Sequence, residues 1–107
     1  MSSKELIKGT LRIIVLKLLA ENRKMYGYEI TQRVKELSGS EIELTFGALY
    51  PTLHRLEAEG LLTTKTVVVD GRTRKYYSLT NQGSEFAPVE IKDYFSFVKA
   101  MNLVLKS

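Results

Sequence analysis

The sequence contains no cysteine, and its single histidine is His54. Without thiols the chain has no disulfides, no thiolate zinc sites and no cysteine nucleophiles. A Ser-His-Asp triad would have to use His54, but no G-x-S-x-G or similar nucleophile motif is present. The paired carboxylates Glu57 and Glu59 stand two residues apart in a predicted helix and would point in different directions. The sequence therefore predicts no enzyme, no metal site and no cofactor.

Long apolar runs are also missing. The run from Ile13 to Ala20 contains Lys17 and is far too short to span a bilayer. No signal-peptide cleavage pattern follows it, so we expect a cytoplasmic protein. The 107 residues are enough for one domain with a modest core. The net charge of +4 favours a polyanionic partner without requiring one.

The stretch from Leu44 to Leu62 predicts a helix with one buried face. Thr45 is placed to cap its amino end and Gly60 its carboxyl end. Pro51 would fall within about the first turn, where a missing N–H does least harm. Three leucines spaced four and three residues apart would share the buried face: Leu49, Leu53 and Leu56.

The opposite arc of this helix is slim and poor in carboxylates. It carries Gly47, Ala48, Pro51, His54, Arg55 and Ala58. A solvated face normally carries more long charged side chains. A narrow face with a few hydrogen-bond donors suits a DNA groove. A half-buried helix of any small domain is the alternative.

Two further helices are expected before this one. The first runs from Leu6 to Glu21 and is apolar nearly all round, so we expect it at the centre of the fold. Its basic strip, Lys4, Lys8 and Arg12, is either a solvated face or a phosphate contact.

The second helix opens at Met25 and runs to about Leu37. Its inner stripe is Ile30, Val34 and Leu37, which Tyr28 would extend. The segment 41–44 alternates charged and apolar residues and predicts a short strand.

A hairpin is predicted after Gly60, with strands over 61–69 and 73–79. Asp70-Gly71 between them is a strong signal for a tight turn. Three cations cluster at the tip and on the return strand: Arg72, Arg74 and Lys75. They either protect an edge strand from aggregation or contact a polyanion.

The remainder, from Thr80 to Ser107, is predicted to be helical. Thr80 would cap a first short piece, and Pro88 would either begin the long helix or kink it. Because the preceding residues already form a core, the apolar stripe of this helix needs another partner, and a second copy of the chain is the simplest one. The stripe consists of Ile91, Tyr94, Phe95, Val98, Met101 and Leu105.

The order helix, helix, short strand, helix, basic hairpin is that of a winged helix-turn-helix. Three blocks in this order closely resemble the PadR-like transcriptional regulators: MYGYEI at 25–30, GALYPTLHRLEAEGLL at 47–62, and RKYYSLT at 74–80 with Gly83. The expected fold is α+β, mostly α. Residues 1–80 would form the winged domain and residues 81–107 a dimerisation helix.

The resemblance implies a homodimer that binds operator DNA, usually as a repressor released by a small ligand. The short tail resembles the compact branch of the family, in some members of which an aromatic residue of this helix lines a drug-binding cavity. Tyr94 or Phe95 could stand there, and core packing is the alternative. The hairpin tip is shorter than is common, and Pro88 lies where the dimer helix is usually continuous.

The resulting hypothesis is a sequence-specific DNA-binding dimer. Base or phosphate contacts are expected from Thr52, His54 and Arg55 at the groove, although Arg55 could instead pair with Glu59. The remaining predicted DNA-binding residues are Lys8, Tyr26, Gly27, Gly47, Tyr50, Pro51, Arg72, Arg74 and Lys75. The alternative is a winged module that binds a ligand or a protein through its last helix without reading DNA.

Overall fold

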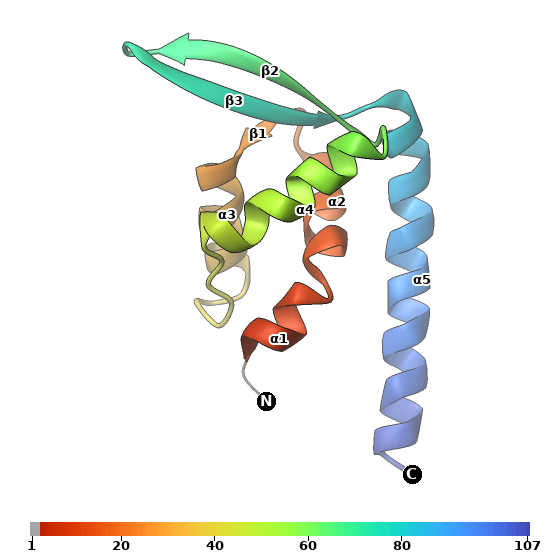
Figure 1. Cartoon of the computed structure of the whole chain (residues 1–107). Helices are drawn as coiled ribbons and strands as arrows, with labels where there is room; N and C mark the ends of the chain where they lie inside the picture. The colour runs from red at the N-terminus through yellow and green to blue at the C-terminus, as the bar shows by residue number, and fades with distance from the viewer. Residues whose placement is uncertain (1–2) are drawn as a thin grey trace.

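The computed structural model of the chain describes residues 3–107, which form five helices and one three-stranded sheet (Figure 1). The elements in chain order are α1 (Ser3–Lys8), α2 (Leu11–Glu21), β1 (Met25–Tyr26), α3 (Gly27–Leu37), α4 (Phe46–Ala58), β2 (Leu62–Val69), β3 (Arg72–Leu79) and α5 (Asn81–Leu105). The class predicted from the sequence, α+β with a predominance of helix, is confirmed. No helix within residues 3–107 is long and apolar enough to cross a membrane.

Helix α2 is the centre of the core, as its apolar circumference predicts. Its buried residues are Leu11, Val15, Leu16, Leu18 and Leu19, and it packs against α3, α4, α5 and β3. The prediction of one helix from Leu6 to Glu21 is wrong, because the chain turns at Gly9 and Thr10. The Thr10 hydroxyl donates to the Ile7 carbonyl at 3.1 Å. Glycine disfavours the helical state and this local bond competes with it, so the helix breaks here.

Residues 25–26 form a strand instead of the start of a helix. Met25 pairs with Tyr77 and Tyr26 with Tyr76, so β1 becomes an edge of the sheet, whose order is β1-β3-β2. Helix α3 then begins at Gly27, and the Tyr26 N–H donates to the Glu29 carboxylate at 3.1 Å.

Two other expectations for this region are wrong. Leu37 is 60% exposed and Tyr28 63% exposed, so only Ile30 and Val34 of the predicted inner stripe are buried. Residues 41–44 form no strand, because no neighbouring strand is available to pair with them. The Ile42 N–H bonds instead to the Ser38 hydroxyl at 2.9 Å.

The predictions for the buried face of α4, its amino-terminal cap and the hairpin are confirmed. The position expected for Pro51 is wrong, because α4 already begins at Phe46 and Pro51 lies inside the helix, beyond its first turn. The leucines at 49, 53 and 56 are fully buried, and the Thr45 side chain accepts a hydrogen bond from the Ala48 N–H at 3.2 Å. Gly60 has φ +80° just past the helix end. Strands β2 and β3 pair from Leu62–Leu79 to Val69–Arg72, and Asp70 and Gly71 make the turn with φ of 50° and 75°.

Helix α5 is a single helix that starts at Asn81. Thr80 caps it, accepting from the Gly83 N–H at 2.9 Å. Pro88 lies inside the helix and does not begin it. The carbonyl that Pro88 leaves unpaired is that of Ser84, and both residues are exposed, so water can satisfy it. The first half of α5 packs against α2 through Ala87 and Ile91, and the second half extends beyond the core (Figure 1).

Candidate nucleic-acid interface

The slim arc of α4 lies on the surface of the molecule. Its members Gly47, Ala48, Pro51, His54, Arg55 and Ala58 are all exposed, while Thr52 is half-buried. The arc lies opposite the three buried leucines, as the helical spacing predicts. The helix therefore offers an exposed side with few bulky groups.

An aromatic row, which the sequence analysis missed, runs beside this arc. The ring centroids of Phe46 and Tyr50 are 5.5 Å apart, and those of Tyr50 and His54 are 5.8 Å apart. The spacing of four residues could have revealed the row. Phe46 also explains Gly27, because a Cβ on Gly27 would lie 2.2 Å from the Phe46 ring. Gly27 thus leaves room for the Phe46 ring of α4 to pack against the start of α3.

A hollow of about 510 Å³ separates α1 from the exposed arc of α4. Several residues predicted to bind DNA line it together: Lys8, Gly47, Pro51, Thr52 and Arg55. Lys8 and Arg55 bring positive charge to its rim, Glu43 brings one negative charge, and Leu11 and Leu44 contribute apolar surface. Residues far apart in the sequence therefore meet on this side of α4.

A second hollow, of about 560 Å³, lies on the wing side of α4. Here β1, α3, α4 and β3 converge, and the predicted residues that line the hollow are Tyr26, Gly27, Tyr50, Arg74 and Lys75. The exposed side of α4 is thus bordered by cations from α1 on one flank and from the hairpin on the other.

The wing cations are not equivalent. Arg72 and Lys75 are exposed, whereas Arg74 is half-buried with its guanidinium 4.5 Å from the centroid of the Tyr26 ring. Tyr26 meets Tyr76 edge to face at 5.4 Å, and Lys24 lies 4.7 Å from the Tyr76 ring. Cations are attracted to aromatic faces at such distances. Lys24 and Tyr76 were not singled out from the sequence, because the pairing of β1 with β3 creates this stack.

Arg12, predicted to lie in a basic strip with Lys4 and Lys8, is instead bound to two carboxylates. Its guanidinium donates to Glu59 at 2.6 and 2.8 Å and to Glu90 at 2.9 Å. The hydrogen bonds from Arg12 hold the pKa of Glu59 below its ordinary value. The alternative considered for Arg55, an ion pair with Glu59, is not formed, because Glu59 pairs with Arg12. The side chain of Lys4 lies outside the described part of the structure.

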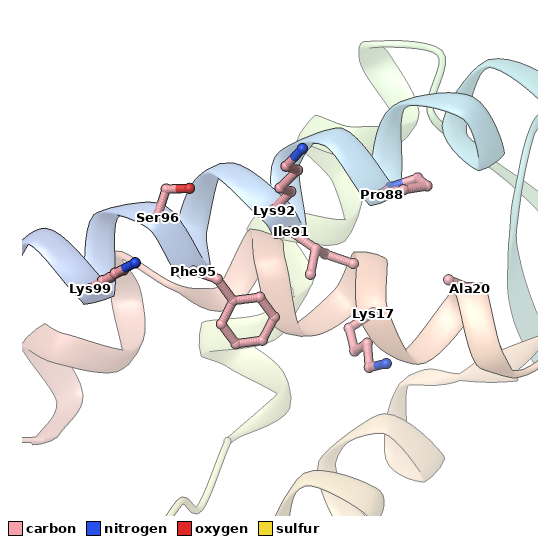
Figure 2. Close-up of a pocket in the computed structure, with 8 residues that line it drawn as sticks. All are labelled: Lys17, Ala20, Pro88, Ile91, Lys92, Phe95, Ser96 and Lys99. Atoms are coloured by element: carbon pink, nitrogen blue, oxygen red, sulfur yellow. The ribbon is translucent and has the colours of Figure 1, made fainter.

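The predicted dimer residues on α5 have different environments. Ile91, Tyr94 and Val98 are half-buried, while Phe95, Met101 and Leu105 are exposed. Ile91 and Phe95 point toward α2 across a groove of about 540 Å³ that has Lys17, Lys92 and Lys99 among its lining residues (Figure 2). Other exposed apolar residues of α5 are Phe86, Val89, Phe97, Leu103 and Val104. Most of the large apolar side chains of α5 therefore stay exposed in the single chain, in spite of its packing against α2.

The fold and this surface define a winged helix-turn-helix protein. Helices α2, α3 and α4 form the helical body, α4 presents an exposed side, and the β2–β3 hairpin is the wing (Figure 1). Comparison with family models then identifies the family. Residues 15–87 match the model of the transcriptional regulator PadR-like family, and the chain belongs to that family. Its members regulate transcription, which is not an enzymatic role.

Individual relatives agree with this assignment. The chain is 42% identical over 80 residues to the transcriptional regulator Rv3488 of Mycobacterium tuberculosis, covering 75% of this chain and 71% of the relative. A transcriptional regulator from Clostridium thermocellum superposes with a TM-score of 0.81 at 26% identity, covering 92% of this chain and 95% of that one. Bacillus subtilis PadR, solved in complex with operator DNA, superposes with a TM-score of 0.66 at 30% identity, covering 80% of this chain and 45% of that one.

Proposed function

We propose that the protein is a sequence-specific DNA-binding regulator that acts as a homodimer on an inverted-repeat operator, with repression as its mode of action. The observation that carries the proposal is the position of α4. Its slim exposed side lies between two hollows, one with Lys8 and Arg55 at its rim and the other with Arg74 and Lys75. A helix in the major groove has phosphates on both sides, so cations are expected on both flanks. Regulation of transcription implies a place where DNA is present, which supports a cytoplasmic location.

Each predicted residue has a defined role in this proposal. Thr52, His54 and Arg55 contact base edges or nearby phosphates, since their side chains offer donors on the exposed side of α4. Gly47 and Pro51 allow close approach because they are small and lack long side chains. Phosphate or minor-groove contacts come from the surrounding residues: Lys8, Tyr26, Tyr50, Arg72, Arg74 and Lys75. Gly27, also predicted from the sequence, is buried beside the Phe46 ring and has no direct contact with DNA in this proposal.

The dimer would form through α5. The half of this helix that extends past the core carries exposed apolar side chains, among them Met101 and Leu105, and a second copy would cover them. The apolar groove with Ile91 and Phe95 supports a subsidiary proposal, that a small apolar or aromatic ligand binds at this interface and releases the protein from DNA.

The exposed apolar half of α5 also favours a second candidate function. A winged module could use this surface to bind a ligand or a protein and never read DNA. Binding of nonspecific duplex at low salt, lost when the wing cations are neutralised, supports the first function. If the folded protein does not bind nonspecific duplex at low salt, the second function, binding of a ligand or a protein through α5, is supported.

Selection of bound duplexes from a random DNA pool tests the proposed function. We expect an enriched inverted repeat, because two identical α4 helices related by a two-fold axis read two identical half-sites. A variant with Thr52, His54 and Arg55 all changed to alanine should bind nonspecific duplex and enrich no motif. Enrichment of the same repeat by this variant would show that these side chains of α4 do not read the DNA sequence.

A further inference from the structure

Arg12 joins three helices through one side chain. It projects from α2, its two terminal nitrogens donate to Glu59 at 2.6 and 2.8 Å, and its Nε donates to Glu90 at 2.9 Å. Glu59 caps the carboxyl end of α4, and Glu90 lies in the first half of α5. We call these three residues the Arg12 clamp.

The clamp depends on the shape of arginine. A guanidinium presents its donors in a planar fork, so it can hold two carboxylates in fixed directions, whereas a lysine ammonium is a point charge. The side chains of Arg12, Glu59 and Glu90 are 31%, 40% and 19% exposed. This partial burial reduces screening by water and salt. Removing Arg12 would also leave two carboxylates at one place with no cation between them.

A second attachment lies close by, where α4 ends and α5 begins. The Thr80 hydroxyl donates to the Gly60 carbonyl at 2.7 Å, and the Thr80 N–H donates to the Leu61 carbonyl at 3.0 Å. The start of α5 is therefore tied to the chain that leaves α4. The packing of Ala87 and Ile91 against α2 also holds the first half of α5. The Arg12 clamp adds a directed link from this half to the end of α4, and so restricts small changes in the angle between α4 and α5.

The length of α5 makes this restriction important. From Glu90 to Leu105 the helix extends for about 22 Å at 1.5 Å per residue. A swing of about 10° at Glu90 would move its far end by about 4 Å, more than the 3.4 Å rise of one base pair. Small changes in the angle between α4 and α5 would thus become large displacements at the end of α5.

We propose that Arg12 is a positioning residue that sets the angle between α4 and α5, and through it the half-site spacing that the dimer accepts. This inference rests on the proposed function, in which α5 joins two protomers and α4 reads DNA. In the proposed dimer α5 joins the two protomers, so the angle between α4 and α5 contributes directly to the separation of the two α4 helices.

The test compares binding to inverted repeats whose spacers differ by one base pair in either direction. The wild-type protein should prefer one spacer by about ten-fold or more, the cost typical of one defect in a specific site. Arg12→Gln should keep the half-site sequence preference but reduce the spacer preference to about three-fold or less. Arg12→Lys, which keeps the charge and loses the fork, should behave similarly.

Arg33→Gln is the matched control. Arg33 pairs with Glu36 at 3.4 Å within α3, so this variant makes the same chemical change and removes an ion pair without touching the clamp. Its spacer preference should equal that of the wild type. If Arg12→Gln also retains the wild-type preference, the proposal is overturned. If Arg12→Gln fails to fold, Glu90→Gln is the substitute, because it removes one branch of the clamp. Its spacer preference should lie between those expected for the wild type and for Arg12→Gln. A spacer preference equal to that of the wild type would overturn the proposal.

A distance measurement without DNA separates this inference from the proposed function. Because the chain has no cysteine, Lys35→Cys and Lys106→Cys can carry two spin labels, one on α3 and one at the end of α5. Dilution with unlabelled chain isolates the distance within one protomer. Arg12→Gln should broaden this distance distribution by several ångströms, and an unchanged distribution counts against the clamp. If the wild type selects no DNA and the distribution still broadens, the proposed function fails and the positioning role of Arg12 stands.

Discussion

At the scale of single residues, the side chains that matter for the proposed interface are held by neighbours that are distant in sequence. Arg74 lies over the Tyr26 ring, and Tyr26 packs against Tyr76. The cations of the wing could be predicted from the sequence, because their clustering near Asp70-Gly71 is visible there. Their partners could not, because the pairing of Tyr26 with Tyr76 depends on a two-residue strand whose pattern is too short to detect.

The stack over Tyr26 gives a prediction about wing binding. Tyr26→Leu should weaken DNA binding by about two- to five-fold, because a cation–π contact near the surface is worth about 0.5–1 kcal/mol. Tyr26→Phe keeps the aromatic face and removes only the hydroxyl, so it should lose less affinity than Tyr26→Leu and measures the part of the loss that is due to the hydroxyl. The measurement is titration of the selected duplex with each variant. Equal weakening by both changes would mean that the Tyr26 hydroxyl matters and the stack does not.

At the scale of elements, hydrophobic periodicity predicted the faces that pack in the core. It did not predict where local hydrogen bonds, glycine or the absence of a pairing partner end an element. The buried face of α4, the hairpin and the capping by Thr80 all follow from patterns in the sequence. The break after Lys8 does not, because the apolar pattern continues across Gly9. Likewise, the alternation over 41–44 is typical of a strand, but a strand needs a partner and none lies beside it. The continuity of α5 past Pro88 is compatible with the exposed positions of Ser84 and Pro88, which only the fold reveals.

Two helical glycines should respond to alanine in opposite directions. A Cβ on Gly83 would lie 2.1 Å from the Leu61 carbonyl oxygen, which belongs to the backbone, so Gly83→Ala should destabilise the protein by about 1–3 kcal/mol. A Cβ on Gly47 meets nothing within 4 Å. Gly47→Ala should therefore stabilise by about 0.5–1 kcal/mol, the ordinary helix preference for alanine.

Denaturant unfolding measures both glycine variants against the wild type. A stabilised Gly83→Ala variant would contradict the close approach of α5 to the end of α4. In the proposed DNA complex, Gly47→Ala has a second expected effect. It should reduce affinity for the duplex despite its greater stability, because it adds a methyl group to the side of α4 that enters the groove.

At the scale of the whole molecule, the unpartnered half of α5 predicts the oligomeric state. Replacing Met101 and Leu105 with glutamate places charge on the exposed apolar surface and should convert a dimer into a monomer, because burying unpaired carboxylates at an interface is costly. Leu37→Glu is the matched control, since Leu37 is also an exposed leucine but lies on α3. Sedimentation equilibrium distinguishes the species. A dimer that survives both changes in α5 would place the interface elsewhere.

The most direct test of the central claim, that α4 and the wing hold duplex DNA together, is the salt dependence of affinity. The logarithm of the binding constant should fall steeply and linearly with the logarithm of salt concentration, because bound phosphates release counterions. Arg72→Gln, which removes an exposed wing cation, should flatten this slope by about two in a dimer, one for each protomer. An identical slope for wild type and variant would show that Arg72, at the exposed tip of the wing, does not contact DNA and would contradict the account.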